Sequence, residues 1–305
     1  MPIIFVTIVN YNGDNDTLSC LKSLNEVRVE GFSLKVIVLD NASKKVFEID
    51  RNQFDNFELS LIKSENNLGF AGGQNVAIKN ALEKGADYIV VLNNDVLLDR
   101  NFLVELLQTF KDKNDVGLVS PKIYFAKGYE FHKDRYEENE LGNVIWYAGG
   151  KMDWKNIIGS HRGVDEVDKG QFNKVEETDF ASGCCVMIRR EVFQEIGFFN
   201  EKYFLYYEDN DFSQRVKLNG FRVYYQPRAM LWHLNAGSTG GSGSNLQDYF
   251  ITRNRLLFGF SYASVRTKAA LLKESIKFLF AGRNFQRKAV LDFYTGRFGK
   301  GSYKL

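Results

Sequence analysis

The stretch that decides the fold is IIFVTIVNYN, residues 3–12. Its first seven residues are apolar or β-branched without interruption, and a polar cluster, Asn10-Tyr11-Asn12, follows at once. A run that is apolar on both faces is typical of a strand in a parallel sheet that helices cover on each side. Three later runs have the same character, at residues 34–39, 59–62 and 88–92.

Two segments with helical periodicity, residues 17–24 and 74–82, lie between these predicted strands. This βαβα order predicts a doubly wound α/β layer. Ligands of such sheets bind beyond the carboxyl ends of the strands. Three polar clusters follow strands here and are expected to meet at one edge: Asn10-Tyr11-Asn12, Asp40-Asn41 and Asn93-Asn94-Asp95.

The rest of the chain divides by composition. Residues 121–177 are rich in glycine, aromatic and charged residues, and we interpret them as an irregular insertion that shapes an acceptor site, with a short strand at 144–147. We then expect a strand at 182–188, a helix at 190–196, closing strands at 221–225 and 229–232, and a Gly/Ser loop at 235–245. The pattern is helical beyond residue 247. The predicted domains are therefore 1–245, catalytic, and 246–305, a helical extension.

Composition limits the class of protein. The 305 residues are 44% hydrophobic and 26% charged, which suits one large domain with an appendage. The three cysteines, Cys20, Cys184 and Cys185, form no C-x-x-C pair, so we expect no disulfide framework or zinc site. We also expect no signal peptide and no run of about 18 apolar residues that could span a bilayer. These expectations favour a reducing, cytoplasmic location.

The last part of the chain is strongly basic. Residues 262–305 contain ten Lys or Arg and two acids, a local charge of +8, whereas the remainder carries −6. Aromatic and leucine side chains alternate with these bases, which favours a helix on an anionic membrane surface. The alternative is a basic face that packs on the body through its aromatics. No nucleic-acid module is recognisable, so no nucleic-acid partner is expected.

Asp95 is the first candidate for chemistry. A carboxylate directly after a buried strand can hold Mg²⁺ or Mn²⁺ together with phosphate oxygens, although an Asn-rich turn would bond the local backbone equally well. The segment Glu208-Asp209-Asn210-Asp211 follows four residues of which three are aromatic. Such neighbours raise a carboxyl pKa, which suits a general base. The same acids would also stabilise the start of a helix at 212–218, and both roles are compatible.

Two further motifs have weaker signals. His233, in Trp232-His233, is one of three histidines and could be a metal ligand, a proton-transfer group or a structural residue. The loop after it could offer backbone N–H groups to phosphate. Residues 66–75, NNLGFAGGQN, lead into a helix whose N-terminus favours anions or sugar hydroxyls. They match neither a P-loop nor a dinucleotide fingerprint, and a tight turn is the alternative.

Taken in order, these motifs resemble the family 2 glycosyltransferases of the GT-A fold, and most of all their rhamnosyltransferase-like members, over residues 3–263. The motifs that carry the resemblance are Val9-Asn10-Tyr11-Asn12, Asp40-Asn41-Ala42-Ser43, residues 67–75, Leu92-Asn93-Asn94-Asp95, Ala181-Ser182-Gly183, Tyr206-Tyr207-Glu208-Asp209-Asn210-Asp211 and Trp232-His233.

The resemblance implies a doubly wound mixed sheet with a C-terminal helical extension, and an inverting transfer from a nucleotide sugar. Asp40 would bind the nucleobase, with Thr7 and Asn10 nearby. The other donor contacts would be Asn12, Asn41, Gly72, Gly73, Asn75, Asn93 and Asn94. Asn93 stands where many members have Asp.

The resemblance also assigns the chemistry. Asp95 and His233 would hold Mn²⁺ or Mg²⁺ on the donor diphosphate. Asp209 would be the base, with Glu208 its neighbour, and the acceptor side would include Trp146, Gly183 and Tyr207.

The implied partners are a nucleotide sugar, with dTDP-rhamnose or a similar deoxysugar favoured, and a growing bacterial surface glycan, free or lipid-linked. The enzyme would then lie at the inner face of the plasma membrane. A UDP-hexose donor is the rival within this class, and a catalytically inactive binding module is the rival outside it. The joint presence of Asp95, Asp209 and His233 favours an enzyme.

Overall fold

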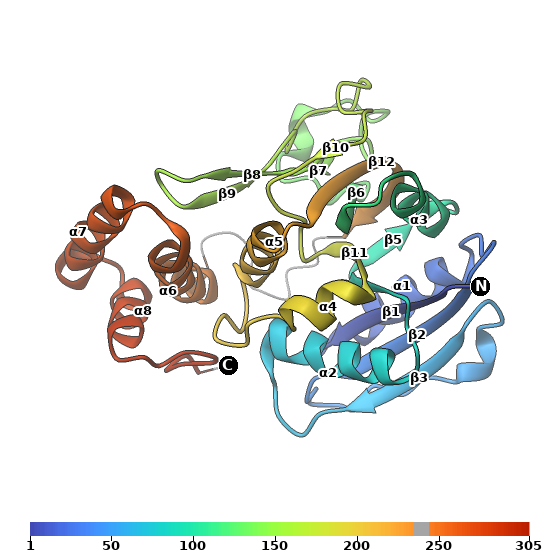
Figure 1. Cartoon of the computed structure of the whole chain (residues 1–305), viewed down its shortest axis with the longest axis horizontal. Helices are drawn as coiled ribbons and strands as arrows, with labels where there is room; N and C mark the ends of the chain where they lie inside the picture. The colour runs from blue at the N-terminus through green and yellow to red at the C-terminus, as the bar shows by residue number, and fades with distance from the viewer. Residues whose placement is uncertain (235–243, 305) are drawn as a thin grey trace.

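The computed structural model describes residues 1–234 and 244–304. Its centre is a ten-stranded mixed sheet (Figure 1). One half is parallel, in the spatial order β3 (Glu58–Lys63), β2 (Ser33–Asp40), β1 (Ile3–Asn10) and β4 (Tyr88–Leu92).

The other half is mixed. Next to β4 follow β11 (Cys185–Arg189), β6 (Val116–Phe125), β12 (Arg222–His233) and β10 (Glu176–Glu177). Here β11 is antiparallel to both its neighbours, and β12 is parallel to β6. Two short strands lie beside this half, β5 (Val96–Leu98) along β12 and β7 (Ile145–Tyr147) along β6.

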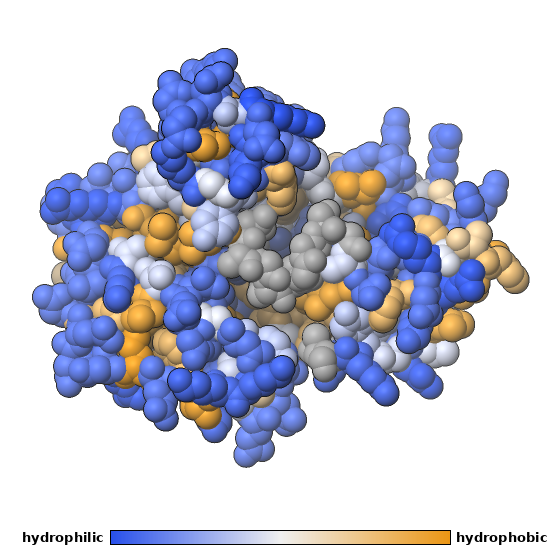
Figure 2. Space-filling model, turned by 180° about the vertical axis from the view of Figure 1, so that it is seen from behind, coloured by the Kyte–Doolittle hydropathy of each residue, from blue (hydrophilic) through white to orange (hydrophobic). Residues whose placement is uncertain are grey.

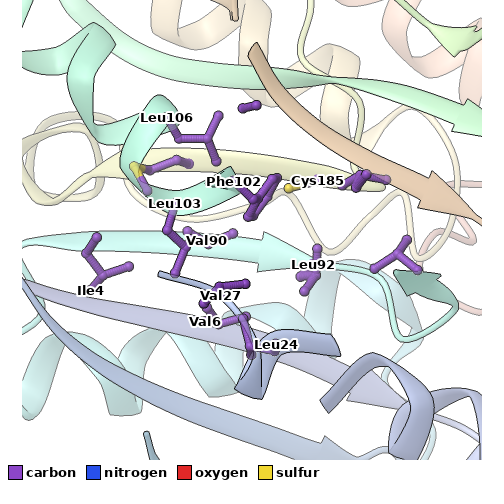
Figure 3. Close-up of a cluster of buried hydrophobic side chains, with 14 of the residues drawn as sticks. Ile4, Val6, Leu24, Val27, Val90, Leu92, Phe102, Leu103, Leu106 and Cys185 are labelled. Atoms are coloured by element: carbon purple, nitrogen blue, oxygen red, sulfur yellow. The ribbon is translucent and has the colours of Figure 1, made fainter. Parts of the chain in front are cut away.

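Helices cover both faces of the sheet. On one face lie α1 (Asp14–Asn25) and α3 (Phe102–Asp112); on the other lie α2 (Gly69–Glu83), α4 (Arg190–Ile196) and α5 (Glu208–Leu218). Strand β1 shows why the deciding run is apolar throughout. Ile4 and Val6 belong to the cluster under α1 and α3 (Figure 3), whereas Phe5 belongs to the cluster under α2.

The expected α/β architecture is confirmed, with three corrections. The two strands expected at 221–225 and 229–232 are one strand, β12, which begins at Arg222 and whose register shifts between Gln226 and Met230. The strand expected from 182 begins at Cys185. Strand β6 was not anticipated, and its second half, from Pro121, lies in the predicted insertion. A proline cannot donate to a ladder and argues against a central strand; here the irregularity of β12 falls opposite it.

Beyond the sheet, a hairpin of β8 (Gly150–Asp153) and β9 (Ile158–His161) projects from the insertion. Two short 3₁₀ turns occur at Arg51–Gln53 and Lys133–Arg135. The chain ends in α6 (Asn245–Tyr262), α7 (Val265–Ala281) and α8 (Asn284–Tyr294). Figure 1 shows these three helices together at one end of the molecule, beside the hairpin. In the described parts of the chain, no helix is long and apolar enough to cross a membrane.

The basic tail, residues 262–305, thus contains two helices, α7 and α8, which pack with α6, and is not one surface helix. Phe278, Leu279 and Phe293 pack around a cluster that also contains Tyr203 and Leu256. For these side chains, the alternative that the tail packs on the body through its aromatic residues therefore applies. Other apolar residues of the tail remain exposed, among them Leu272, Ile276 and Phe280.

Candidate active site

A cavity of about 800 Å³ opens beyond the carboxyl end of β4, between the sheet, the β8–β9 hairpin and α6. It gathers predicted residues from distant parts of the chain. Those that line it are Asn93, Asp95, Trp146, Gly183, Tyr207, Glu208, Asp209 and His233. The residues predicted for the metal, for the base and for the acceptor side therefore surround one space.

Strand pairing places Asp95 next to His233. In the antiparallel pair of β5 and β12, Val96 lies opposite His233, and the Leu234 N–H donates to the Asp95 carbonyl oxygen at 2.8 Å. His233 Nε2 lies 3.2 Å from Asp95 Oδ1, and both side chains are buried. Two residues far apart in sequence thus present a carboxylate and an imidazole to the same point of the cavity.

The histidine ring is available as a ligand. Within residues 1–234 and 244–304, neither ring nitrogen of His233 has a hydrogen-bond partner, and the carboxylate oxygen Oδ1 of Asp95 lies 3.2 Å from Nε2. Buried polar atoms are seldom left unpartnered. An imidazole nitrogen beside a carboxylate oxygen fits a divalent cation such as Mn²⁺. No group of three or more His, Cys, Asp or Glu side chains forms a metal site in these ranges, so phosphate oxygens and water would complete the shell.

An aromatic wall flanks this pair. The Trp146 ring centroid lies 4.7 Å from that of His233 and 4.3 Å from that of His161. Burial lowers the pKa of His161 to about 4. The hydrogen bond between His161 Nδ1 and the Trp146 carbonyl oxygen acts in the opposite direction and raises this pKa, but by less. His161 is therefore neutral at ordinary pH, and this wall adds no positive charge to the cavity.

Asp209 is held in a defined orientation in the first turn of α5. Its Oδ2 accepts the Gly183 N–H at 3.0 Å, and its Oδ1 accepts the backbone and side-chain N–H groups of Asn210 at 2.8 and 2.9 Å. Burial raises the pKa of Asp209, and these hydrogen bonds oppose the rise. A fixed carboxylate with a raised pKa that borders a cavity is suited to accept a proton.

Glu208 has a different environment. It is buried, and its Oε2 has no hydrogen-bond partner among the residues that the structure describes. Burial, and then the neighbouring Asp209, raise the pKa of Glu208 well above its ordinary value. The two adjacent carboxyl groups are thus distinct: one is supported by N–H donors, and the other favours its neutral form.

Several predicted donor contacts face the interior instead. The Thr7 hydroxyl donates to Gln74 Oε1 at 2.7 Å, and the Asn75 amide donates to the Phe199 carbonyl oxygen at 2.9 Å. A Cβ on Gly73 would lie 3.1 Å from Val9 Cγ2, so this glycine allows α2 to approach β1. Thr7, Gly73 and Asn75 are buried and contact protein in this structure, and their contacts with a donor stay predictions.

Gly72 likewise serves the packing of α2, where an added Cβ would lie 2.9 Å from Leu68 Cβ. The Asn94 amide donates to Thr17 Oγ1 of α1 at 3.0 Å. Asn10 accepts from the same Thr17 hydroxyl at 2.9 Å. Asn10 and Asn94 thus hold the first part of α1, through Thr17, against the edge of the sheet.

Asp40 and Asn41 shape the loops at the same edge. Asp40 Oδ1 accepts the Ser43 N–H at 3.3 Å, and the Asn41 amide donates to the Gly69 carbonyl oxygen at 3.1 Å. Both are buried. Asn12 is exposed and borders a separate depression of about 390 Å³. Their contacts to a nucleotide stay predictions. The Gly/Ser loop expected to bind phosphate lies, for residues 235–243, outside the described residues.

Sequence reasoning missed the contribution of the C-terminal helices. Arg255 of α6 lines the cavity, donates to the Asn156 carbonyl oxygen at 2.8 Å, and pairs with Glu274 of α7 at 2.9 Å. Gln247, Ile251 and Glu274 line it too, as do Phe180, Ser182 and the free thiol of Cys184. The available signal was the polar run Arg253-Asn254-Arg255, which is followed at once by the apolar residues 256–258 of the same helix.

Comparison with known proteins identifies the family and the fold. Residues 2–259 match the family described as glycosyltransferase like family 2. A low-salt glycan biosynthesis hexosyltransferase, Agl10 of Haloferax volcanii, is 26% identical over 253 residues, which are 83% of this chain and 74% of the relative. The N-acetylglucosaminyl-diphospho-decaprenol L-rhamnosyltransferase of Mycobacterium tuberculosis is 42% identical over 188 residues, 59% of this chain and 60% of the relative.

Among solved structures, GalNAc-T7 with UDP, GalNAc and Mn²⁺ superposes with a TM-score of 0.61 at 14% identity. The match covers 96% of this chain and 58% of that one, so the chain spans little more than half of that protein. At this identity the likeness concerns the fold alone. With the sequence match over residues 2–259, it confirms the expected family and fold: the chain belongs to the family 2 glycosyltransferases and has the GT-A fold.

Proposed function

We propose that this protein is a metal-dependent inverting glycosyltransferase that extends a bacterial surface glycan from a nucleotide-sugar donor, with dTDP-rhamnose or a similar deoxysugar favoured. One observation carries the proposal: a single cavity of about 800 Å³ is lined both by the pair Asp95 and His233 and by the oriented carboxylate of Asp209. The cavity thus offers a site for a donor diphosphate and a base for an acceptor.

In the proposed reaction, Asp209 accepts the proton of an acceptor hydroxyl. The hydroxyl oxygen bonds to the anomeric carbon on the face opposite the leaving group, and the bond to the nucleoside diphosphate breaks. One displacement inverts the configuration at that carbon. Asp95 and His233 would hold the cation, which when bound offsets the charge that develops on the departing diphosphate.

The base assignment is tested by Asp209→Asn, which keeps the shape of the side chain and removes its basicity. General base catalysis contributes about a hundred- to ten-thousand-fold, so we expect kcat to fall by this order while donor affinity is retained. Asp112→Asn, at an exposed carboxylate of α3, is the control. Full turnover in Asp209→Asn would refute the assignment.

The metal site is tested by Asp95→Ala and His233→Ala. Each should weaken Mn²⁺-dependent binding of a nucleoside diphosphate at least about tenfold, or 1.4 kcal/mol, in a calorimetric titration. Unchanged metal dependence in Asp95→Ala would contradict the placement.

The donor is tested by a thermal-shift screen against nucleotide sugars with and without Mn²⁺, since a bound donor stabilises the fold by mass action. The rhamnosyltransferase relative favours a deoxysugar, and the hexosyltransferase relative favours a hexose, as in the UDP-hexose alternative, without indicating the nucleotide. Donor binding without transfer or hydrolysis would instead indicate an inactive binding module.

For the acceptor, we propose a glycan, free or lipid-linked, at the inner face of the plasma membrane. The support lies on α7, where Leu272, Ile276 and Phe280 are 43%, 47% and 80% exposed and recur every four residues along one face. Lys273 and Lys277 lie between them. Figure 2 shows hydrophobic patches among hydrophilic ones at the end of the molecule that these helices form. An exposed apolar row beside lysines fits an anionic bilayer surface.

A further inference from the structure

The loop that leads into the catalytic turn has an unfavourable backbone conformation. Phe204, Tyr206 and Tyr207 have φ angles of +65°, +67° and +71°. Bulky L-residues rarely adopt this left-handed conformation, because their Cβ comes too close to the backbone. Tyr207 directly precedes α5, whose first turn carries Asp209. A strained segment of this kind persists only where surrounding groups hold it.

Asn254 of α6 is one of the groups that hold this loop. The side chain is fully buried, and its amide Nδ2 lies 2.8 Å from each of three backbone carbonyl oxygens, those of Tyr203, Leu205 and Tyr206. These three acceptors cover the part of the loop with left-handed φ angles. One amide therefore fixes the directions of successive peptide groups that would otherwise relax.

Arg253 supports the same loop from the next position. It is also fully buried, and its guanidinium donates to the carbonyl oxygens of Lys202 and Tyr203 at 3.1 and 3.0 Å. A third bond reaches the Gly299 carbonyl oxygen at 2.7 Å, and Nε donates to Asn254 Oδ1 at 3.0 Å. The arginine thus orients the asparagine amide and ties the loop to the C-terminal segment.

The loop also contacts the start of α2. The Phe204 carbonyl oxygen accepts the Phe70 N–H of α2 at 2.8 Å, and a Cβ on Gly69 would lie 2.4 Å from that oxygen. A shift of the loop would therefore move Asp209 relative to α2 and to the cavity.

We propose that Arg253 and Asn254 are positioning residues: by fixing the strained loop 202–207, they set the place of the Asp209 carboxylate against the reacting atoms. The inference rests on the proposed function, in which Asp209 is the base. It makes the first helix of the extension part of the catalytic apparatus, although neither residue touches substrate.

The test compares Asn254→Ala and Arg253→Lys with Ser275→Ala. The control lies on α7 of the same extension and removes a buried hydroxyl that shares a hydrogen bond with Tyr294 of α8, away from the loop. A misplacement of about 1 Å can reduce turnover about a hundredfold. We expect kcat to fall about ten- to a hundredfold in both test variants, with the donor KM within about twofold of wild type and near-wild-type kcat in the control.

Amide hydrogen exchange by mass spectrometry provides a readout that needs no activity. We expect peptides over residues 202–209 to exchange about tenfold faster or more in Asn254→Ala, and at the wild-type rate in Ser275→Ala, because local opening governs exchange. Arg253→Lys, which keeps the charge and one donor, serves the same comparison if Asn254→Ala does not fold.

The outcomes separate the two proposals. A wild-type protein that transfers no sugar would refute the proposed function. Amide hydrogen exchange would still test whether Asn254 and Arg253 fix the conformation of the loop. Unaltered exchange over 202–209 would overturn the inference. A kcat in Asn254→Ala equal to that of Ser275→Ala would overturn it too, as would a loss of activity that appears only in the donor KM.

Discussion

Two neighbouring carboxyl groups, Asp209 and Glu208, differ because different atoms surround them. Asp209 accepts N–H groups from Gly183 and Asn210 and borders the cavity. Glu208 is buried with an unpartnered Oε2 in the described part of the chain. Separation of two carboxyl groups by environment is a common way to assign acid and base roles. It leads to two predictions at the level of single residues.

The first concerns the pH dependence of transfer. Asp209 must be deprotonated to act, and burial raises its pKa above the ordinary 3.8. Activity should therefore rise with pH through a value above 3.8 and be lost below it. The measurement is kcat/KM against pH, with stability checked at each point. An acid limb at or below the ordinary value for Asp would contradict the raised pKa.

The second concerns stability. The raised pKa of Glu208 means that the folded state favours its protonated form, so its contribution to stability is present at low pH and is lost as pH rises through the folded pKa. Glu208→Gln removes this dependence. We expect the Tm of the variant to exceed that of wild type at pH 8, by about 2–4 °C per kcal/mol, and the difference to shrink toward pH 5. A variant that melts lower at pH 8 would show that the ionised form is needed for folding.

At the level of elements, the hairpin β8–β9 and helix α6 meet through Ile157. This residue is fully buried in the cluster of the extension, and its φ is +55°. Its carbonyl oxygen accepts the Tyr207 hydroxyl at 2.8 Å, so the hairpin also supports the residue that precedes α5. A β-branched residue rarely adopts such a φ, because its side chain then crowds the backbone. At Ile157 the burial of the side chain offsets the energy of this conformation.

This geometry predicts an inverted order of stability at residue 157. Ile157→Ala leaves a cavity and should destabilise the fold by about 2–4 kcal/mol. Ile157→Gly removes slightly more of the side chain but adopts the positive φ without strain. We therefore expect the glycine variant to unfold at a higher urea concentration than the alanine variant. The usual order, with alanine more stable, would mean that the left-handed conformation is absent in solution.

At the level of the whole molecule, the extension has two faces with different tasks. Its inner face packs on the loop before α5 through Leu256, Phe258 and Tyr203. Its outer face carries the exposed row on α7. A truncation after residue 263 would remove α7 and α8, including Glu274, which lines the cavity and pairs with Arg255. Point substitutions on the outer face are therefore the sharper test of membrane binding.

We predict that Phe280→Ser together with Ile276→Ser weakens binding to anionic vesicles about tenfold or more in sedimentation assays, with transfer to a soluble acceptor unchanged. Leu218→Ser is the matched control, since Leu218 is 65% exposed on α5 and outside the extension. Equal vesicle binding in all three proteins would exclude this face as the membrane contact.

The sequence by itself determined the α/β class and the family. Runs such as residues 3–9 need helices on both faces, and motif order is a property of the chain alone. The expected residues Asp95, Asp209 and His233 do border one cavity. Their catalytic roles stay predictions.

Only the tertiary structure decided where each side chain points and which distant groups it meets. The pattern of β1 does not reveal that Thr7 bonds to Gln74, because a hydroxyl in a strand can face a ligand or a helix. Likewise, the sequence pattern of α6 does not reveal that the Asn254 amide donates to carbonyl groups of loop 202–207. Such bonds depend on long-range packing that aligns one donor with several acceptors, and local periodicity contains no information about that alignment.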